Sequence, residues 1–164
     1  MALTDAHKTL PNIAEILGPV LQRVSREQQP LLLAIAERRA AQRYRDWAKE
    51  CADQPYASQL AACAEREEQI ASHVEGLSPD AVTIQQTILS KNPDLEEINR
   101  SIFADRPLMQ QFTIQAQGER LGAATWRAFA ENEKDPVRSS VFWKCAELEE
   151  QSAVVLEAIL GASR

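Results

Sequence analysis

The sequence predicts an all-α fold, a four-helix bundle that is built from a duplicated helix hairpin. The string CAEREEQ at residues 63–69 returns as CAELEEQ at residues 145–151, and only Arg66 changes, to Leu148. Apolar residues along most of the chain recur at steps of three and four, which is the signature of a helix face. Ala, Leu, Glu, Gln and Arg dominate the composition, and these residues lose little on entering a helix. A chain of 164 residues can bury a substantial core, so we expect a single domain over residues 1–164.

The repeat extends beyond this string, because one constant offset superposes further residues of the two halves. An internal repeat indicates that one supersecondary unit occurs twice in the chain. We interpret it as a duplicated helix pair with unlike sequence between the two copies. The matched positions are Glu37-Arg38 with Glu119-Arg120, Ala41 with Ala123, Tyr44-Arg45 with Trp126-Arg127, Ala48 with Ala130, Ala71 with Ala153 and Glu75 with Glu157.

The first half of the chain is predicted to hold an N-terminal helix and the first hairpin. Residues 1–10 are expected to be flexible, and residues 11–24 show apolar residues at helical spacing. Ser25 and Gln28 resemble a capping box that opens the first helix of a hairpin at residues 26–75. An Asp-Gln-Pro turn separates the two helices of this hairpin, and a glycine ends the second.

The second half is predicted to repeat this hairpin after a long connection. Residues 77–106 form a crossover with two short helical pieces, around 81–89 and 94–104. The second hairpin occupies residues 107–160, and its last helix is expected to begin near Ser139. A helix of about 28 residues spans roughly 42 Å. The crossover is long enough to travel that distance, as in bundles with one long crossover connection.

Composition and charge exclude several classes of partner. The net charge is −6, from 18 basic and 24 acidic residues, and the basic residues do not cluster, so we expect no nucleic-acid partner. No apolar run approaches the roughly 20 residues needed to cross a bilayer, so we expect no membrane insertion. Residues 1–9 do not resemble a secretory signal, and three cysteines without a CxxC pair favour free thiols in a reducing compartment. A cytoplasmic location is the expectation.

Each of the four long helices carries one glutamate on its predicted inward face: Glu37, Glu67, Glu119 and Glu149. Ionised carboxylates in a packed core are costly unless they are paired or bound to a metal. Because the repeat places them at corresponding levels, we expect them to converge on divalent cations. Oxygen ligands suit manganese, iron(II) or magnesium better than zinc or copper(I). The alternatives are a different helix register, with some of the four at a solvated edge, and a metal-free core that shares protons.

These residues resemble a known family. The segment from Glu37 to Tyr44 resembles the Glu-x6-Tyr motif of the rubrerythrin branch of the ferritin-like superfamily, and Ala64-Glu65-Arg66-Glu67 resembles that family's second ligand helix. The second hairpin repeats both motifs, so the resemblance in architecture covers nearly all of residues 26–160.

The resemblance implies a site with two iron or manganese ions, in a protein with an oxidase, peroxidase or metal-handling role. It makes Glu37 and Glu119 terminal ligands, and it makes Glu67 and Glu149 bridging ligands.

The sequence departs from the family pattern at two ligand positions. The family places a histidine three residues after each bridging glutamate, where this chain has Ile70 and Ser152. His73 lies off the inward face, and His7 lies in the N-terminal tail. A rubredoxin-type CxxC pair is also missing, so no electron donor is identified. The sequence therefore leaves open an all-carboxylate metal site and, as the alternative, a metal-free bundle that acts as a structural or protein-interaction module.

Other repeated residues admit two interpretations. Tyr44 and Trp126 either donate hydrogen bonds to the core carboxylates or are ordinary core aromatics. Cys63 and Cys145 are either redox-active thiols or buried space-filling residues. The repeated arginines at 38, 45, 120 and 127 are expected to be solvated or salt-bridged. The apolar sides of the N-terminal and crossover helices either cover the bundle or form a homodimer interface.

Overall fold

The computed structural model describes residues 9–163, which form seven helices and no strand. The prediction of an all-α protein is confirmed. The expectation of flexibility for residues 1–10 falls mainly on residues 1–8, which lie outside the described part of the chain. The helices are α1 (Ile13–Leu21), α2 (Gln29–Glu50), α3 (Ala57–Glu75), α4 (Ala81–Lys91), α5 (Leu95–Phe103), α6 (Leu108–Asn132) and α7 (Pro136–Ala162).

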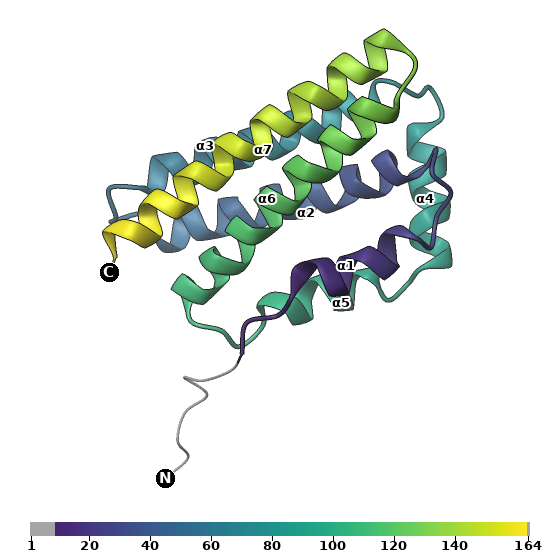
Figure 1. The fold of residues 1–164 in the computed structure, drawn as a ribbon. Helices are drawn as coiled ribbons and strands as arrows, with labels where there is room; N and C mark the ends of the chain where they lie inside the picture. Colours follow the sequence, from purple (N-terminus) through teal and green to yellow (C-terminus); the bar gives the residue numbers. More distant parts are fainter. Residues whose placement is uncertain (1–8, 164) are drawn as a thin grey trace.

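The four long helices form two hairpins that pack against each other (Figure 1). Helix α2 packs along α3, α6 packs along α7, and the two hairpins meet most closely where α3 contacts α7. Helices α4 and α5 carry the chain from one end of the bundle to the other, so that α6 starts far from the end of α3. This is the arrangement that the long crossover predicted.

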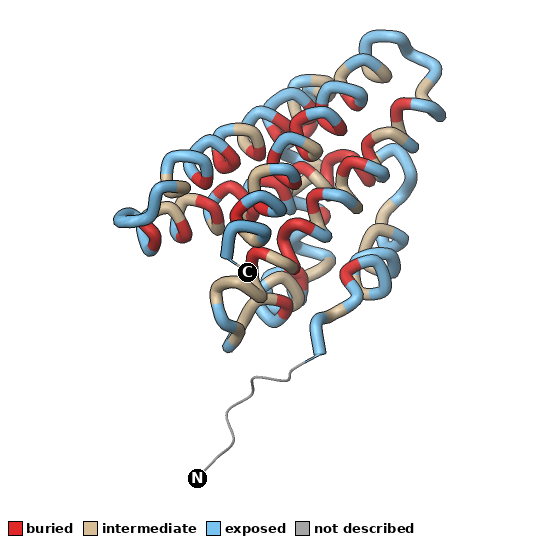
Figure 2. Tube along the Cα trace, turned by 60° about the vertical axis from the view of Figure 1, so that its left-hand side comes forward, coloured by how far each residue is buried: buried red, intermediate tan, exposed pale blue. Residues whose placement is uncertain are grey.

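The predicted inward faces are buried, as the red stripes along the helices in Figure 2 show. Leu33 and Ala48, which the helical period also places on the inward face of α2, are the exceptions, because both are only half-buried. Two apolar clusters fill the bundle, one around Trp126 and Phe142 and the other around Tyr44, Trp47 and Phe112. The buried inward residues are Glu37, Ala40, Tyr44 and Trp47 of α2 with Cys51 at its C-cap, Leu60, Cys63, Glu67, Ile70 and Val74 of α3, Phe112, Ala116, Glu119, Ala123, Trp126 and Ala130 of α6, and Phe142, Cys145, Glu149, Ser152, Leu156 and Ile159 of α7.

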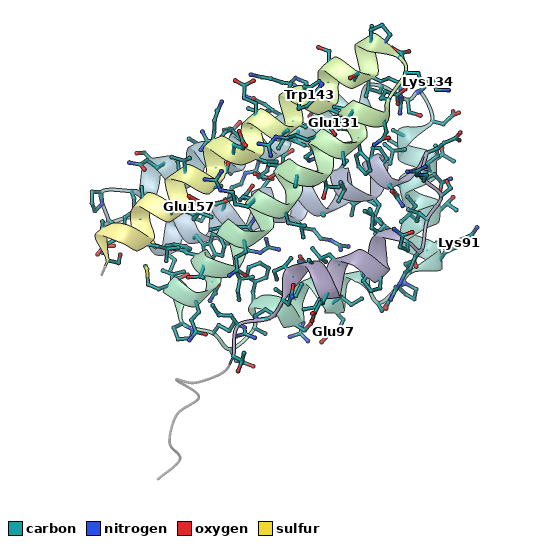
Figure 3. All side chains as sticks on the ribbon, in the orientation of Figure 1. Lys91, Glu97, Glu131, Lys134, Trp143 and Glu157 are labelled. Carbon is teal, nitrogen blue, oxygen red and sulfur yellow. The ribbon has the colours of Figure 1, made fainter. Side chains whose placement is uncertain are left out.

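The two hairpins repeat their surface ion pairs as well as their cores. In each hairpin two arginines of the first helix pair with two glutamates of the second, which confirms the prediction for these arginines. Glu157, one of the acidic partners, lies on the outer side of α7 (Figure 3). The equivalent pairs are Arg38–Glu75 with Arg120–Glu157, and Arg45–Glu68 with Arg127–Glu150.

Two helix starts differ from the prediction. The capping box is wrong: α2 has Gln28 as its N-cap without a side-chain bond, and Ser25 uses its carbonyl oxygen in the preceding turn. Helix α7 begins at Pro136, before Ser139, because the Asp135 carboxylate caps the backbone N–H groups of the first turn. Proline is well suited to the first helical position, where its missing N–H costs nothing.

Helices α1, α4 and α5 cover the side of the bundle formed by α2 and α6. Ile13 of α1 and Ile102 of α5 are buried together against Ile114 of α6. Ile88 and Leu95, from α4 and α5, are buried against α2. The structure therefore shows these helices covering the bundle, while dimerisation stays a prediction. No helix within residues 9–163 is both long enough and apolar enough to span a bilayer.

Candidate metal centre

Three of the four core glutamates meet in the middle of the bundle. Glu37 of α2, Glu67 of α3 and Glu149 of α7 each offer a carboxylate oxygen, and these three oxygens lie within 4.8 Å of one another. All three side chains are buried. The 3.6-residue period places each glutamate on the same helix face as the core residues, so the bundle itself brings the carboxylates together.

Glu67 is the least satisfied member of this group. Both of its carboxylate oxygens are buried, and neither has a hydrogen-bond partner. Buried polar atoms are almost always paired, and an unpaired buried carboxylate is costly. The two unpaired oxygens are suited to bind a divalent cation, since hard divalent cations prefer carboxylate oxygens as ligands.

Glu149 is held in place by groups on α6. The Nε1 atom of Trp126 donates a hydrogen bond to Oε1 of Glu149 at 3.1 Å. Gly122 gives the carboxylate room, because a Cβ atom at this position would lie 2.5 Å from the same oxygen. A glycine here allows Glu149 to reach the other two carboxylates.

Glu119 is not part of the group of three. Its Oε1 atom accepts two hydrogen bonds, from the Tyr44 hydroxyl at 2.5 Å and from Nε2 of Gln115 at 2.8 Å. Its Oε2 atom is buried and has no partner. Tyr44 and Trp126 thus both donate to core carboxylates, while their part beside a bound metal stays a prediction.

A half-buried arginine, Arg43, contacts Glu119 indirectly, through Gln115. The Arg43 guanidinium donates to Oε1 of Gln115 at 2.6 Å and to Oδ1 of Asn99 at 2.7 Å, and it lies 3.8 Å from the centre of the Phe103 ring. Burial lowers the pKa of Arg43 to about 10. We did not expect this network from the sequence. One signal was present, because Gln115 stands where the repeat has Leu33.

Burial sets the protonation of the metal-free centre. It raises the pKa of Glu37, although contacts with Glu67, Glu149 and Trp126 oppose the shift. Burial raises the pKa of Glu67 well above its usual range, and the nearby carboxylates add to this rise. The same causes raise the pKa of Glu149. Without a cation this centre favours bound protons, and a metal ion would have to displace them.

The positions where the family has histidines are filled by other groups. Ile70 is fully buried in the apolar core. The hydroxyl of Ser152 accepts a hydrogen bond from Nε of Arg66 at 3.0 Å, and Nη2 of Arg66 lies 3.1 Å from the Cys63 sulfur. His73 is exposed, and His7 lies outside the described residues. The centre therefore has no imidazole from residues 9–163.

The repeated cysteines are poor nucleophiles in this structure. Cys63 and Cys145 are buried and free. Burial raises the pKa of Cys63, and it raises the pKa of Cys145 to about 12. Reactive cysteines need thiolate character, so the structure favours the space-filling interpretation.

Comparisons of the chain with protein-family models, with curated proteins and with solved structures give no match.

Proposed function

We propose that the protein is a ferritin-like metal protein of the rubrerythrin type that holds iron or manganese at the centre of its bundle. The observation that carries this proposal is the group of Glu37, Glu67 and Glu149, whose oxygens lie within 4.8 Å of one another. The orphaned oxygens of Glu67 support it, because a cation would supply the partner that the protein does not.

In this proposal the three carboxylates hold the cation and the surrounding side chains fix their positions. Trp126 orients Glu149 through its N–H group, and the apolar clusters on either side keep bulk water away. Iron or manganese bound here would supply redox chemistry towards oxygen or peroxide. The resemblance also expects a second ion on Glu119, whose Oε2 atom is free to serve it.

Elemental analysis tests this proposal. The full chain is expressed without a chelating tag and with added iron and manganese, and its metal content is measured after purification. We expect about one ion per chain from the three-carboxylate geometry, and about two if Glu119 also binds metal.

The double variant Glu67→Gln/Glu149→Gln should lose the metal, because amides are weaker ligands than carboxylates. The matched control is Glu65→Gln/Glu147→Gln, which changes exposed glutamates of the same two helices. An unchanged metal content in the core variant would exclude these carboxylates as the site.

A second function is favoured by one observation, the filling of both histidine positions. Ile70 belongs to the apolar core, and Ser152 is engaged by Arg66. A metal-free bundle with this centre would act as a structural or protein-interaction module. In that case the Glu67→Gln/Glu149→Gln variant should be as stable as the parent or more stable, since it removes buried ionisable groups.

A further inference from the structure

A cavity of about 430 Å³ lies between the bundle and the helices that cover it. Helices α1 and α5 form its outer wall, and α2 and α6 form its inner wall. Glu37, Glu119 and Glu149 line its inner end, while most of the remaining wall is apolar. The cavity has the size of a small-molecule site. Like such sites, it has a mostly apolar wall with a few polar groups.

Small residues of the repeat keep this space open. Ala36 and Ala40 of α2 line the cavity, and their repeat equivalents Gly118 and Gly122 line it from α6. A Cβ atom added to Gly118 would meet no other atom within 4 Å. Helices α2 and α6 also approach each other less closely than the helices within each hairpin do. The duplication thus places two small residues on each side of the same opening.

One residue that lines the cavity, Glu119, has a buried oxygen without a partner. Glu119 is only 1% exposed, and its Oε1 atom is saturated by Tyr44 and Gln115. Its Oε2 atom accepts no hydrogen bond from the protein. A carboxylate oxygen in this state needs a hydrogen-bond donor, which a molecule in the cavity could provide.

We propose that this cavity binds a medium-chain organic molecule with an apolar body and a hydrogen-bond-donating head, and that the head donates to Oε2 of Glu119. An anionic head is disfavoured, because Glu37 and Glu149 line the same end of the cavity. The nearby guanidinium of Arg43 does not change this, since it is engaged by Gln115 and by an asparagine. The head would compete with the second ion that the resemblance expects on Glu119, but not with an ion held by Glu37, Glu67 and Glu149, so the inference goes beyond the proposed function.

The test uses 1-decanol as the probe and decanoate as its acceptor-headed counterpart. Binding to the full chain is measured by isothermal titration calorimetry, for the protein as purified and again after treatment with a chelator. We expect 1-decanol to bind the chelated protein, in which Oε2 of Glu119 holds no ion, and to bind it at least tenfold more tightly than decanoate.

Filling the cavity should abolish this binding. Gly118→Leu places a side chain in the open space, and Ala36→Leu does the same from the opposite wall, so that one variant can replace the other if either fails to fold. The matched control is Gly161→Leu, where an added Cβ also meets nothing but lies outside the cavity. We expect at least a tenfold loss in the two cavity variants and no change in the control.

Three results would overturn the proposal. They are no binding of 1-decanol to the chelated parent protein, binding to a folded cavity variant that equals that of the parent, and decanoate binding as tightly as 1-decanol to the chelated protein. Metal content is measured separately, so failure here leaves the metal centre untouched.

Discussion

The two hairpins carry the same pair of glutamates at equivalent places, yet the structure uses the two pairs differently. Glu37 and Glu67 of the first hairpin both join the group of three, whereas the second hairpin contributes only Glu149. Glu119 instead accepts hydrogen bonds from a tyrosine and a glutamine. The repeat therefore fixes where the carboxylates stand, and the unlike residues around them decide what each one contacts.

The equivalent aromatic residues show the same difference. Tyr44 of α2 donates across the bundle to Glu119 in the other hairpin, while Trp126 of α6 donates to Glu149 within its own hairpin. Each donor pairs with a buried carboxylate oxygen, but of the two only Trp126 donates to a member of the group of three. The two hairpins therefore differ in the hydrogen bonds that the neighbouring aromatic residues donate to the glutamates.

The largest effect that we expect is a pH dependence of stability in the metal-free protein. The folded-state pKa values of Glu37, Glu67 and Glu149 are raised above the usual value of 4.5. A carboxyl group whose pKa is higher in the folded protein makes its full contribution to stability below its pKa in the unfolded protein. That contribution is lost as the pH rises through its pKa in the folded protein. The melting temperature of the chelated protein should therefore decrease as the pH is raised from 5 to 8.

The control for this experiment is Glu67→Gln, which removes one of the three titrating groups and should flatten the pH dependence. A melting temperature that rises from pH 5 to pH 8 in the chelated parent would contradict the burial of protonated carboxylates at this centre.

The next effect compares the two aromatic donors. Tyr44→Phe removes a hydrogen bond to the buried carboxyl group of Glu119 and should cost about 1–3 kcal/mol of unfolding free energy, because a buried acceptor loses its donor. Trp126→Phe should cost more, because it removes a hydrogen bond and also leaves unfilled space beside Phe142, whose ring centre lies 5.8 Å away. Urea denaturation measures both. Equal losses would mean that the two halves are interchangeable at this position.

A smaller change at α6 should weaken metal binding. Gly122→Ala places a Cβ atom 2.5 Å from Oε1 of Glu149, which is too close for a Cβ contact, so the carboxylate must move away from its partners. We expect a tenfold to hundredfold loss of affinity for manganese, on the order of other changes that misorient a ligand. The equivalent change in the other half, Ala40→Gly, adds no atom and should leave the affinity within a few-fold. Titration followed by electron paramagnetic resonance distinguishes the two.

The smallest effect belongs to the surface ion pairs. Arg38 pairs with both Glu68 and Glu75, whereas Arg120 pairs with Glu157. Exposed pairs contribute about 0–1 kcal/mol. Arg38→Ala should therefore destabilise slightly more than Arg120→Ala, and both losses should shrink in high salt. A loss of unfolding free energy well above 1 kcal/mol in either variant would show that these ion pairs contribute more than ordinary exposed pairs do.

The sequence was sufficient for the helices and the inward glutamates because both follow from local spacing. A period of 3.6 residues places Glu67 on the same helix face as Leu60 and Cys63, independently of the rest of the fold. The second copy of the repeat has the same spacing, which supports the same helix register. Helix starts were less predictable. Ser25 has the residue type of a cap, but the turn before α2 uses its backbone instead.

The side-chain network and the cavity could not be predicted, because both depend on residues that are distant in the chain. Arg43 reaches Asn99 and Gln115, which belong to two later helices. An arginine on a helix is usually solvated, and Arg43 is half-buried because Asn99 and Phe103 of α5 lie against it. The cavity likewise arises from how α1 and α5 cover α2 and α6, which no local pattern encodes.

The most direct test of the central claim is anomalous X-ray diffraction from crystals of the full chain expressed with iron and manganese, collected at the absorption edges of both metals. The proposal predicts an anomalous peak bounded by the carboxylates of Glu37, Glu67 and Glu149. A well-folded protein whose three carboxylates surround no anomalous density would contradict it, and would favour the metal-free bundle.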